Sequence, residues 1–401
     1  MTTMRALIAT TVKKQWQTFQ LDVNNAFLHG DIHEEVYMHV PLRLENDNPC
    51  LVCKLNKSLY GLVNLLRPVH MRCISCGPES LSGSSRQTEH STIHITVYVD
   101  DVIITGTDDV IITGTDLSEI AQLKHFLHDQ FKTKDLGRPH YFLGLKVLYI
   151  ADCVIISQRK FALDILKEYD CLPYSSLSTS LDPNEKLRAN EGAPLSNPTY
   201  YRRLVGKLNF LTNTRLDIAF SVQYLSQIMQ DPRESHLKAA FHLLRYLKND
   251  PTLWIFLSNE SACSLKGYCD SDWAACPDSR RSVTGYIVLL GNSPICWKSK
   301  KQETVSLSSA KAKYMSLRKQ VSVFCDSQSA LHIARNPVFH ERTIDIEADC
   351  HFVRDKLHEG LISLHHIATG AQLAYVLTKA LTGVKHYALL SKLAVKPSPQ
   401  T

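Results

Sequence analysis

Two acidic positions in the first third of the chain have the residue types and the setting of a divalent-cation site. One is Asp22, in the run Gln-Leu-Asp-Val, and the other is the pair Asp100–Asp101, which follows the strand-forming residues Val97–Val99. Phosphoryl transfer by two metal ions needs hard oxygen ligands on rigid elements, with the metals about 3.5–4 Å apart. Taken singly, each aspartate is also a common turn residue, so the prediction depends on their occurring together.

The second acidic position is part of a tandem duplication. The sequence DDVIITGT occupies Asp100–Thr107 and is repeated at once at Asp108–Thr115. An even insertion preserves the alternation of side chains between the faces of a strand, so an extended ribbon or a bulged loop can absorb it. The run HITVYV stands directly before Asp100, whereas Asp108–Asp109 follows a Gly-Thr step. The sequence therefore predicts the first pair as the site and the second pair as displaced.

The elements expected to position these aspartates belong to an α+β fold. We expect strand and turn over Phe19–Phe27, and a tight turn at Asp100–Asp101 followed by a return strand at Val102–Thr105. Pro, Asn and Ser at high density over Leu177–Pro198 indicate a linker. Helical apolar spacing predicts helices at Thr3–Thr18, Leu117–Phe131, Lys160–Tyr169, Ala310–Leu317 and Ser327–Ala334. It also predicts helix over most of Tyr200–Asn249, with breaks near Asp217 and at Asp231–Pro232. Alternating apolar residues predict a hairpin of Tyr141–Val147 with Val154–Ser157, and strands at Glu34–Val40, Leu265–Tyr268 and Thr284–Leu290.

Composition permits a nucleic-acid partner without requiring one. The chain has 401 residues, 45 Lys and Arg, and a formal net charge of +6, which suits a polyanion. No apolar run reaches the roughly 18 residues of a membrane span, and the first residues lack the features of a signal peptide. We therefore expect an intracellular protein, cytoplasmic or nuclear, without a membrane partner and with its 12 cysteines mostly reduced.

Four of the cysteines have the spacing of a zinc ribbon. Cys50 and Cys53 form one C-x2-C pair, and Cys73 and Cys76 form another 19 residues further on. That gap is in the usual range for zinc, although scattered buried thiols are the simpler interpretation. Elsewhere, Lys298, Lys300 and Lys301 beside Trp297 suggest either an aromatic platform that tracks a phosphate backbone or a solvated basic loop.

Long motifs in the first part resemble the reverse transcriptase of Ty1/copia-class LTR retrotransposons. They are LDVNNAFLHGDIHEEVYMHVP, VCKLNKSLYGL, VYVDD, KDLGRPHYFLGLKV and YRRLVGKLNFLTNTRLDIAFSVQYLSQ, and the whole match runs from about residue 20 to 380. The resemblance implies an RNA-directed DNA polymerase that acts on an RNA template and a DNA primer, with two Mg²⁺ held by Asp22, Asp100 and Asp101. It also implies that Phe27 blocks a ribose 2′-OH, that the Tyr60–Gly61 region supports template and nucleotide, and that Tyr141–Gly144 is the primer-grip hairpin.

Motifs in the second part resemble the RNase H domain of the same elements. They include LKGYCDSDWAACPDSRRSVTGY, FCDSQSALHIARNPVFHERT and TGAQLAYVLTKAL. The family uses four acids around two Mg²⁺ to cut RNA in an RNA–DNA hybrid. The resemblance assigns Asp270 as the first acid, with Asp272 as the fallback, and Asp326 as the third.

The other two acids of the RNase H family are replaced in this chain. Lys313 stands at the second position and Tyr375 at the fourth. One unit-charge contact at 4 Å is worth about 4 kcal/mol at an effective dielectric constant of 20. A lysine in a two-metal site reverses the sign of that contact, so we expect RNase H activity to be lost.

Further departures shape the expected organisation. The fingers strands are missing before Asp22, residues 63–92 do not follow the family, and the segment Leu317–Val321 is short enough to truncate the RNase H-like α/β domain. We expect a palm/thumb-like reverse transcriptase region at 1–175, a linker and helical thumb or connection at 176–258, an RNase H-like domain at 259–390 and a tail at 391–401. The number of lesions favours a catalytically defective, non-enzymatic remnant over an active polymerase; a nucleic-acid-binding module is the third hypothesis. The sequence does not determine an oligomeric state.

Overall fold

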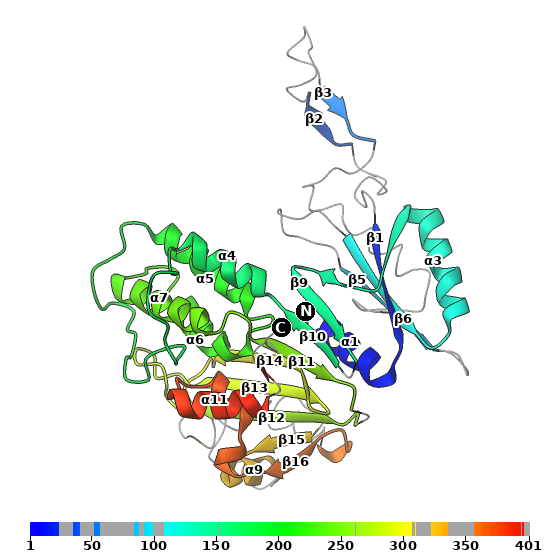
Figure 1. Ribbon diagram of the computed structural model, residues 1–401. Coiled ribbons are helices and arrows are strands. Elements are labelled where there is room, and N and C mark those ends of the chain that lie inside the picture. Colours follow the sequence, from blue (N-terminus) through cyan, green and yellow to red (C-terminus); the bar gives the residue numbers. More distant parts are fainter. Residues whose placement is uncertain are drawn as a thin grey trace. The chain divides into compact units, whose positions relative to one another are not determined.

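The computed structural model divides the chain into two compact units of mixed α/β structure (Figure 1). One unit is formed by residues 15–143, and the other by residues 1–14 together with residues 144–401. The structure describes residues 1–23, 35–40, 52–56, 84–87, 92–98, 108–151, 153–260, 262–306, 309, 322–335, 357–393 and 395–396. The boundaries predicted at 175 and 258 both lie within the second unit, and they stay predictions.

A five-stranded antiparallel sheet with one helix against it makes up most of the described part of unit 15–143. Its strand order is β4-β5-β6-β1-β7. The strands are β1 (Gln17–Val23), β4 (Ser84–Gln87), β5 (Thr92–Tyr98), β6 (Asp108–Gly114) and β7 (Thr133–Gly137), and the short strands β2 (Tyr37–His39), β3 (Val52–Lys54) and β8 (Tyr141–Phe142) lie outside this sheet.

Helix α3 (Leu117–Phe131) covers one face of that sheet and has the predicted bounds. The Asp116 side chain caps it, accepting from the backbone N–H groups of Ser118 at 2.8 Å and Glu119 at 3.2 Å. Leu21, Val110 and Ile112 of the sheet pack with Ile120 and Leu127 of the helix in one buried cluster. Because side chains alternate along a strand, this cluster identifies the face that β1 and β6 turn towards α3.

The second unit contains two further sheets. One has the order β17-β11-β10-β9, and the other β14-β13-β12-β15-β16, in which β15 runs parallel to both β12 and β16. The strands are β9 (Leu145–Ile150), β10 (Cys153–Ser157), β11 (Trp254–Ser258), β12 (Leu265–Asp272), β13 (Val283–Leu290), β14 (Ser293–Lys301), β15 (Ser322–Cys325), β16 (Ser363–His366) and β17 (Val395–Lys396). The predicted hairpin is confirmed as β9 paired with β10, but its first strand begins at Leu145 and not at Tyr141, because Tyr141–Phe142 form the separate strand β8.

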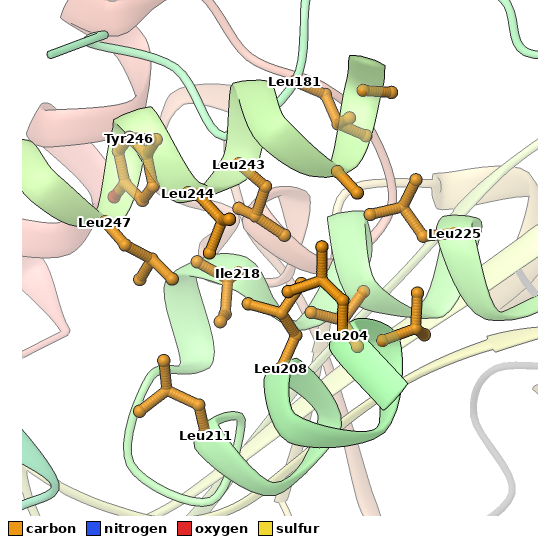
Figure 2. Packing of buried hydrophobic residues seen from close by; sticks show 14 of the residues in the cluster. Leu181, Leu204, Leu208, Leu211, Ile218, Leu225, Leu243, Leu244, Tyr246 and Leu247 are labelled. Atoms are coloured by element: carbon orange, nitrogen blue, oxygen red, sulfur yellow. The ribbon is translucent and has the colours of Figure 1, made fainter. Parts of the chain in front are cut away.

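Helices of the second unit pack around one buried hydrophobic cluster, part of which Figure 2 shows. They are α4 (Arg159–Glu168), α5 (Pro198–Leu211), η3 (Leu216–Ile218), α6 (Ala219–Ser226) and α7 (Glu234–Asn249); the unit also holds α1 (Thr2–Lys14), α9 (Gln328–Arg335), η5 (Thr369–Ala371), η6 (Leu373–Leu377) and α11 (Gly383–Lys392). In α5, Tyr201, Leu204, Val205, Leu208 and Leu211 are buried, which is the spacing of one helical face. The predicted helical run with its two breaks is confirmed.

No described helix is both long and apolar enough to cross a membrane.

Candidate functional site

Asp22 lies near the end of β1 with its side chain half-buried. Its neighbour Leu21 packs towards α3, so Asp22 belongs to the opposite face of the sheet. In the strand register, Asp22 lies opposite Asp109 of β6 on one side and opposite Lys134 of β7 on the other. The strand thus places one carboxylate between an acidic and a basic position.

The strand next to Asp22 is built from the second copy of the duplicated sequence. β6 begins at Asp108, which lies opposite Val23, and Asp109 also lies opposite Tyr98 of β5. The prediction that the second copy is displaced is therefore wrong for its backbone, which forms strand β6. The two copies have the same sequence, so either could pair with β1 and β5. Asp100, Asp101 and the return strand predicted at Val102–Thr105 lie outside the described residues.

Several other predicted site residues also lie outside the described part of the chain. They are Phe27, Gly61 and Lys313, together with Cys50, Cys73 and Cys76. Cys53 is described and lies half-buried in β3, opposite Met38. The zinc ribbon and the roles of Phe27 and Gly61 therefore stay predictions.

A second acidic centre lies in the sheet of the second unit. Asp270 is near the end of β12 and has 0% exposure, while Asp326 directly follows the parallel neighbour β15. The parallel pairing of Tyr268 with Phe324 brings the two aspartates to adjacent strand ends. The fallback residue, Asp272, is the last residue of β12.

Hydroxyl and ammonium groups from one segment contact these two carboxylates. The Thr378 hydroxyl donates to Asp270 Oδ2 at 2.7 Å, and Lys379 Nζ lies 3.8 Å from the same oxygen. The Tyr375 hydroxyl donates to Asp326 Oδ2 at 2.5 Å, and Lys379 Nζ lies 4.1 Å from the centre of the Tyr375 ring. One oxygen of each carboxylate therefore already accepts a hydrogen bond from the chain itself, and the Lys379 ammonium lies near Asp270.

Close backbone approach explains how this segment reaches Asp270. Gly285 of β13 lies opposite Asp270 in the register. A Cβ atom at Gly285 would meet Leu377 Cβ at 2.7 Å and Thr378 Cγ2 at 2.8 Å, so only glycine leaves the needed space. Gln372 adds a bridge, since its Nε2 donates to the Cys269 carbonyl at 2.9 Å. The sequence analysis did not predict that Thr378, Lys379 and Gly285 lie at this acidic centre. The only sequence feature that pointed to any of them is the Thr-Lys pair after Leu377.

The two acidic centres differ in how well they suit Mg²⁺. Mg²⁺ takes carboxylate oxygens at its site, and the strand register places Asp22 opposite the backbone position of a second aspartate, Asp109. Around Asp270 and Asp326 the ammonium and hydroxyl donors compete with a cation. Within the described part, no three or more His, Cys, Asp and Glu side chains gather closely enough to hold a metal ion. The side chains of Asp108 and Asp109 are outside that part, so the finding bears on the second centre alone.

The proposed aromatic platform at Trp297 is wrong. The Trp297 side chain is 8% exposed, and the Arg5 guanidinium covers its ring at 3.8 Å. Its indole N–H donates to the Thr212 carbonyl at 3.0 Å. The ring is used in packing because β14 alternates buried and exposed residues, and Trp297 falls on the buried face.

A buried charged network, which sequence reasoning missed, joins the helices to α11. Arg215 pairs with Asp217 at 2.8 Å, Tyr246 donates to Asp217 at 2.8 Å, and the Tyr246 hydroxyl lies 2.8 Å from His386 Nε2. Burial alone would raise the pKa of Asp217, but the charge and hydrogen bonds of Arg215 outweigh it and hold the pKa below its usual value. Burial lowers the pKa of His386.

Comparison with known proteins identifies the class of this chain. Residues 1–180 match the family of reverse transcriptases (RNA-dependent DNA polymerases). The Pol polyprotein of transposon RE1 from Arabidopsis thaliana is 36% identical over 99% of this chain and 29% of the relative. That of transposon TNT 1-94 from Nicotiana tabacum is 30% identical over 94% of the chain and 31% of the relative.

A transposon Ty5-1 protein of Saccharomyces cerevisiae is 29% identical over 75% of this chain and 99% of its own length. The chain belongs to the Ty1/copia-type retrotransposon Pol polyproteins and carries their reverse transcriptase domain. It spans about 29–31% of the plant polyproteins that it matches. No solved structure matches it.

Proposed function

We propose that this chain is the reverse transcriptase and RNase H part of a Ty1/copia-type Pol polyprotein, with a polymerase-type metal site and a defective RNase H-type site. The observation that carries the proposal is the strand register, in which Asp22 lies opposite an aspartate of the duplicated motif, inside the segment that matches reverse transcriptases. The sheet of unit 15–143 then serves as palm, and the helices between 176 and 258 as thumb or connection.

The proposed reaction is extension of a DNA primer on an RNA template inside the cell. Two Mg²⁺, when bound, would stabilise the attacking 3′-oxygen and the leaving pyrophosphate oxygen. Asp22, with one of the two aspartate pairs of the repeat, would hold them: the sequence names Asp100–Asp101, and the register brings the backbone of Asp108–Asp109 alongside. Phe27 would exclude a ribose 2′-OH, and the Gly61 region would support the template and the nucleotide.

The second sheet supports an RNase H-like domain that no longer cuts. Asp270 and Asp326 occupy adjacent strand ends, but Lys379 and Tyr375 contact these carboxylates. Lys313 adds a further positive charge where the family has an acid. Such a domain would still suit binding of an RNA–DNA hybrid without hydrolysis.

A second candidate function, a non-enzymatic remnant that binds nucleic acid, is favoured by these same contacts. Primer extension by the purified full chain on an RNA template with Mg²⁺ separates the two. The polymerase proposal predicts extension that disappears in Asp22→Asn, and no cleavage of a labelled RNA–DNA hybrid. Binding of primer–template without extension would establish the remnant instead, and hybrid cleavage would refute the defective second site.

A further inference from the structure

Three side chains of one short segment contact the two aspartates of the second acidic centre. The Tyr375 hydroxyl donates to Asp326 Oδ2 at 2.5 Å, and the Thr378 hydroxyl donates to Asp270 Oδ2 at 2.7 Å. The Lys379 ammonium lies 3.8 Å from the same oxygen of Asp270. The donors follow one another closely in the chain, whereas the acceptors lie at the ends of two neighbouring parallel strands, β12 and β15. One segment therefore bridges both strands through their carboxylates.

Further contacts hold the same segment against the sheet. Gln372 Nε2 donates to the Cys269 carbonyl at 2.9 Å, directly before Asp270 in the chain. The apolar residues of η6 between Gln372 and Thr378 are buried; they are Leu373, Ala374, Val376 and Leu377. The carboxylate contacts are thus part of a wider attachment.

Burial of Asp270 makes its donors necessary. The side chain has 0% exposure, and a carboxylate charge that is taken out of water is costly unless donors or a cation compensate it. Asp270, Asp272 and Asp326 all belong to the described residues, and among those no His, Cys, Asp and Glu side chains form a group of three or more that could hold a metal ion. The compensation comes instead from the hydroxyls and the ammonium of the chain.

The segment continues into α11, which contacts the helices of the second unit. The His386 imidazole lies 2.8 Å from the Tyr246 hydroxyl of α7, and Asn249 of α7 donates to the Tyr387 hydroxyl at 2.7 Å. The contacts at the two aspartates therefore fix one end of a connection between the sheet and α7.

We propose that Asp270 and Asp326 form, with Tyr375, Thr378 and Lys379, a metal-independent clasp that holds the segment 372–379, and with it α11, on the sheet. The inference rests on the proposed defective RNase H-type site and gives its carboxylates a structural role. Carboxylates that converge on a metal repel one another when the metal is absent, so replacing one of them by an amide relieves that repulsion. In a clasp the same replacement removes a bonded partner, so its effect on stability has the opposite sign.

Thermal melts of the full chain in the presence of EDTA test that sign. Asp270→Asn and Asp326→Asn are each expected to lower the melting temperature by about 3 °C or more, because each removes a charged hydrogen-bond acceptor. Asp164→Asn is the matched control, since Asp164 is exposed on α4 of the same unit, and its change should stay within about 2 °C. An unchanged or raised melting temperature in either clasp variant overturns the proposal.

Tyr375→Phe provides a second test if the aspartate variants do not fold. Hydrogen exchange measured by mass spectrometry should become faster in residues 372–393 of this variant, because the segment and α11 lose one attachment, and should stay unchanged in α5. Unchanged exchange in residues 372–393 would contradict the clasp.

Titration with Mn²⁺ separates the clasp from the proposed function. Mn²⁺ should raise the melting temperatures of the unaltered chain and of Asp326→Asn by the same amount, because an ion bound elsewhere stabilises both alike. A rise that is lost in Asp326→Asn would place a metal at the second centre and overturn the clasp. If the chain does not cleave an RNA–DNA hybrid and Asp326→Asn is not destabilised, the clasp alone fails; hybrid cleavage by the unaltered chain refutes the defective site as well.

Discussion

Arg215 and Asp217 form an ion pair whose two side chains are almost completely buried. The guanidinium meets both carboxylate oxygens at 2.8–3.2 Å and also donates to the Asp250 carbonyl at 2.9 Å. A buried pair of this kind contributes little net stability compared with apolar packing. Loss of one partner, in contrast, strongly destabilises the fold, because it leaves the other charge unpaired in the protein interior.

Asp217→Ala is therefore expected to lower the free energy of unfolding by about 3–5 kcal/mol. Urea denaturation followed by circular dichroism measures this loss in the free energy of unfolding. The matched control is Asp231→Ala, which breaks the pair with Arg233, where the aspartate side chain is 64% exposed; exposed pairs are worth about 0–1 kcal/mol. Similar losses from the two variants would contradict the buried-pair argument.

His386 makes the same network sensitive to pH. Burial lowers its pKa in the folded chain, whereas the unfolded value is about 6.5. The unfolded state therefore binds more protons as the pH falls below about 6.5, and folding stability drops with it. Protonation of Asp217, whose pKa is also lowered, would act only at more acidic pH.

We expect the urea midpoint of the chain to fall between pH 7.5 and pH 5.5, and to fall less in His386→Gln. The comparison uses each variant's own midpoint at pH 7.5 as reference, since the substitution also alters the contact with Tyr246. An undiminished pH dependence in His386→Gln would assign the effect to other groups.

At the scale of elements, β13 can lie close to Leu377 and Thr378 because it has a glycine, Gly285, at the point of contact. Gly285→Ala would put a Cβ 2.7 Å from Leu377 Cβ, and overpacking of this kind costs about 1–3 kcal/mol. Gly206→Ala is the control, because Gly206 lies inside α5 with nothing within 4 Å of its Cβ position, and alanine there is expected to stabilise the chain by about 0.4–1 kcal/mol. Thermal melts of both variants test the opposite signs.

Elements with strong local signals are predictable from this sequence, and contacts between distant residues are not. Leu117–Phe131 is predicted with the bounds of α3 because its apolar residues recur at helical spacing. The partnership of Tyr246 with His386 joins residues 140 positions apart, and no local pattern encodes it. The duplicated motif shows a further limit: two identical copies have identical propensities, so no local signal tells which of them forms the strand beside β1.

The candidate site was predictable to the same extent. The strand that carries Asp22 follows from the sequence, and the resemblance names Asp270 and Asp326. The strand predicted at Leu265–Tyr268 ends before Asp270, however, and β15 before Asp326 was not predicted. Lys379 was not anticipated at the second centre, since its contact with Asp270 depends on the close approach that Gly285 permits. Residue types alone do not reveal such a close approach.

At the scale of the whole molecule, the second unit is discontinuous in sequence. Helix α1 (Thr2–Lys14) belongs to it, with Met4, Ile8 and Ala9 buried. Arg5 donates to the Ile295 carbonyl at 3.0 Å and stacks on Trp297, and Lys13 donates to the Glu260 carbonyl at 2.8 Å. A fragment of residues 144–401 alone therefore lacks part of its own core.

We expect that fragment to be less stable than the unit in the full chain, and to recover when a synthetic peptide of residues 1–14 is added. The melting temperature of the fragment should rise as peptide is added, because a ligand that binds only the folded form stabilises it by an amount that grows with the logarithm of its concentration. A peptide that carries Arg5→Ala should bind the fragment more weakly and raise its melting temperature less. Equal melting temperatures with and without peptide would show that α1 is dispensable.

The position of α1 also has a consequence for folding during synthesis. Its first turn leaves the ribosome long before β14, to which Arg5 is joined across 290 positions of sequence. α1 also contacts β10 and β11, so its native partners emerge stepwise, and the set is incomplete until β14 has been made. Contacts of such long sequence separation slow folding, and an unpaired apolar segment is prone to aggregation during that delay. The nascent chain therefore depends on a partner that is synthesised late.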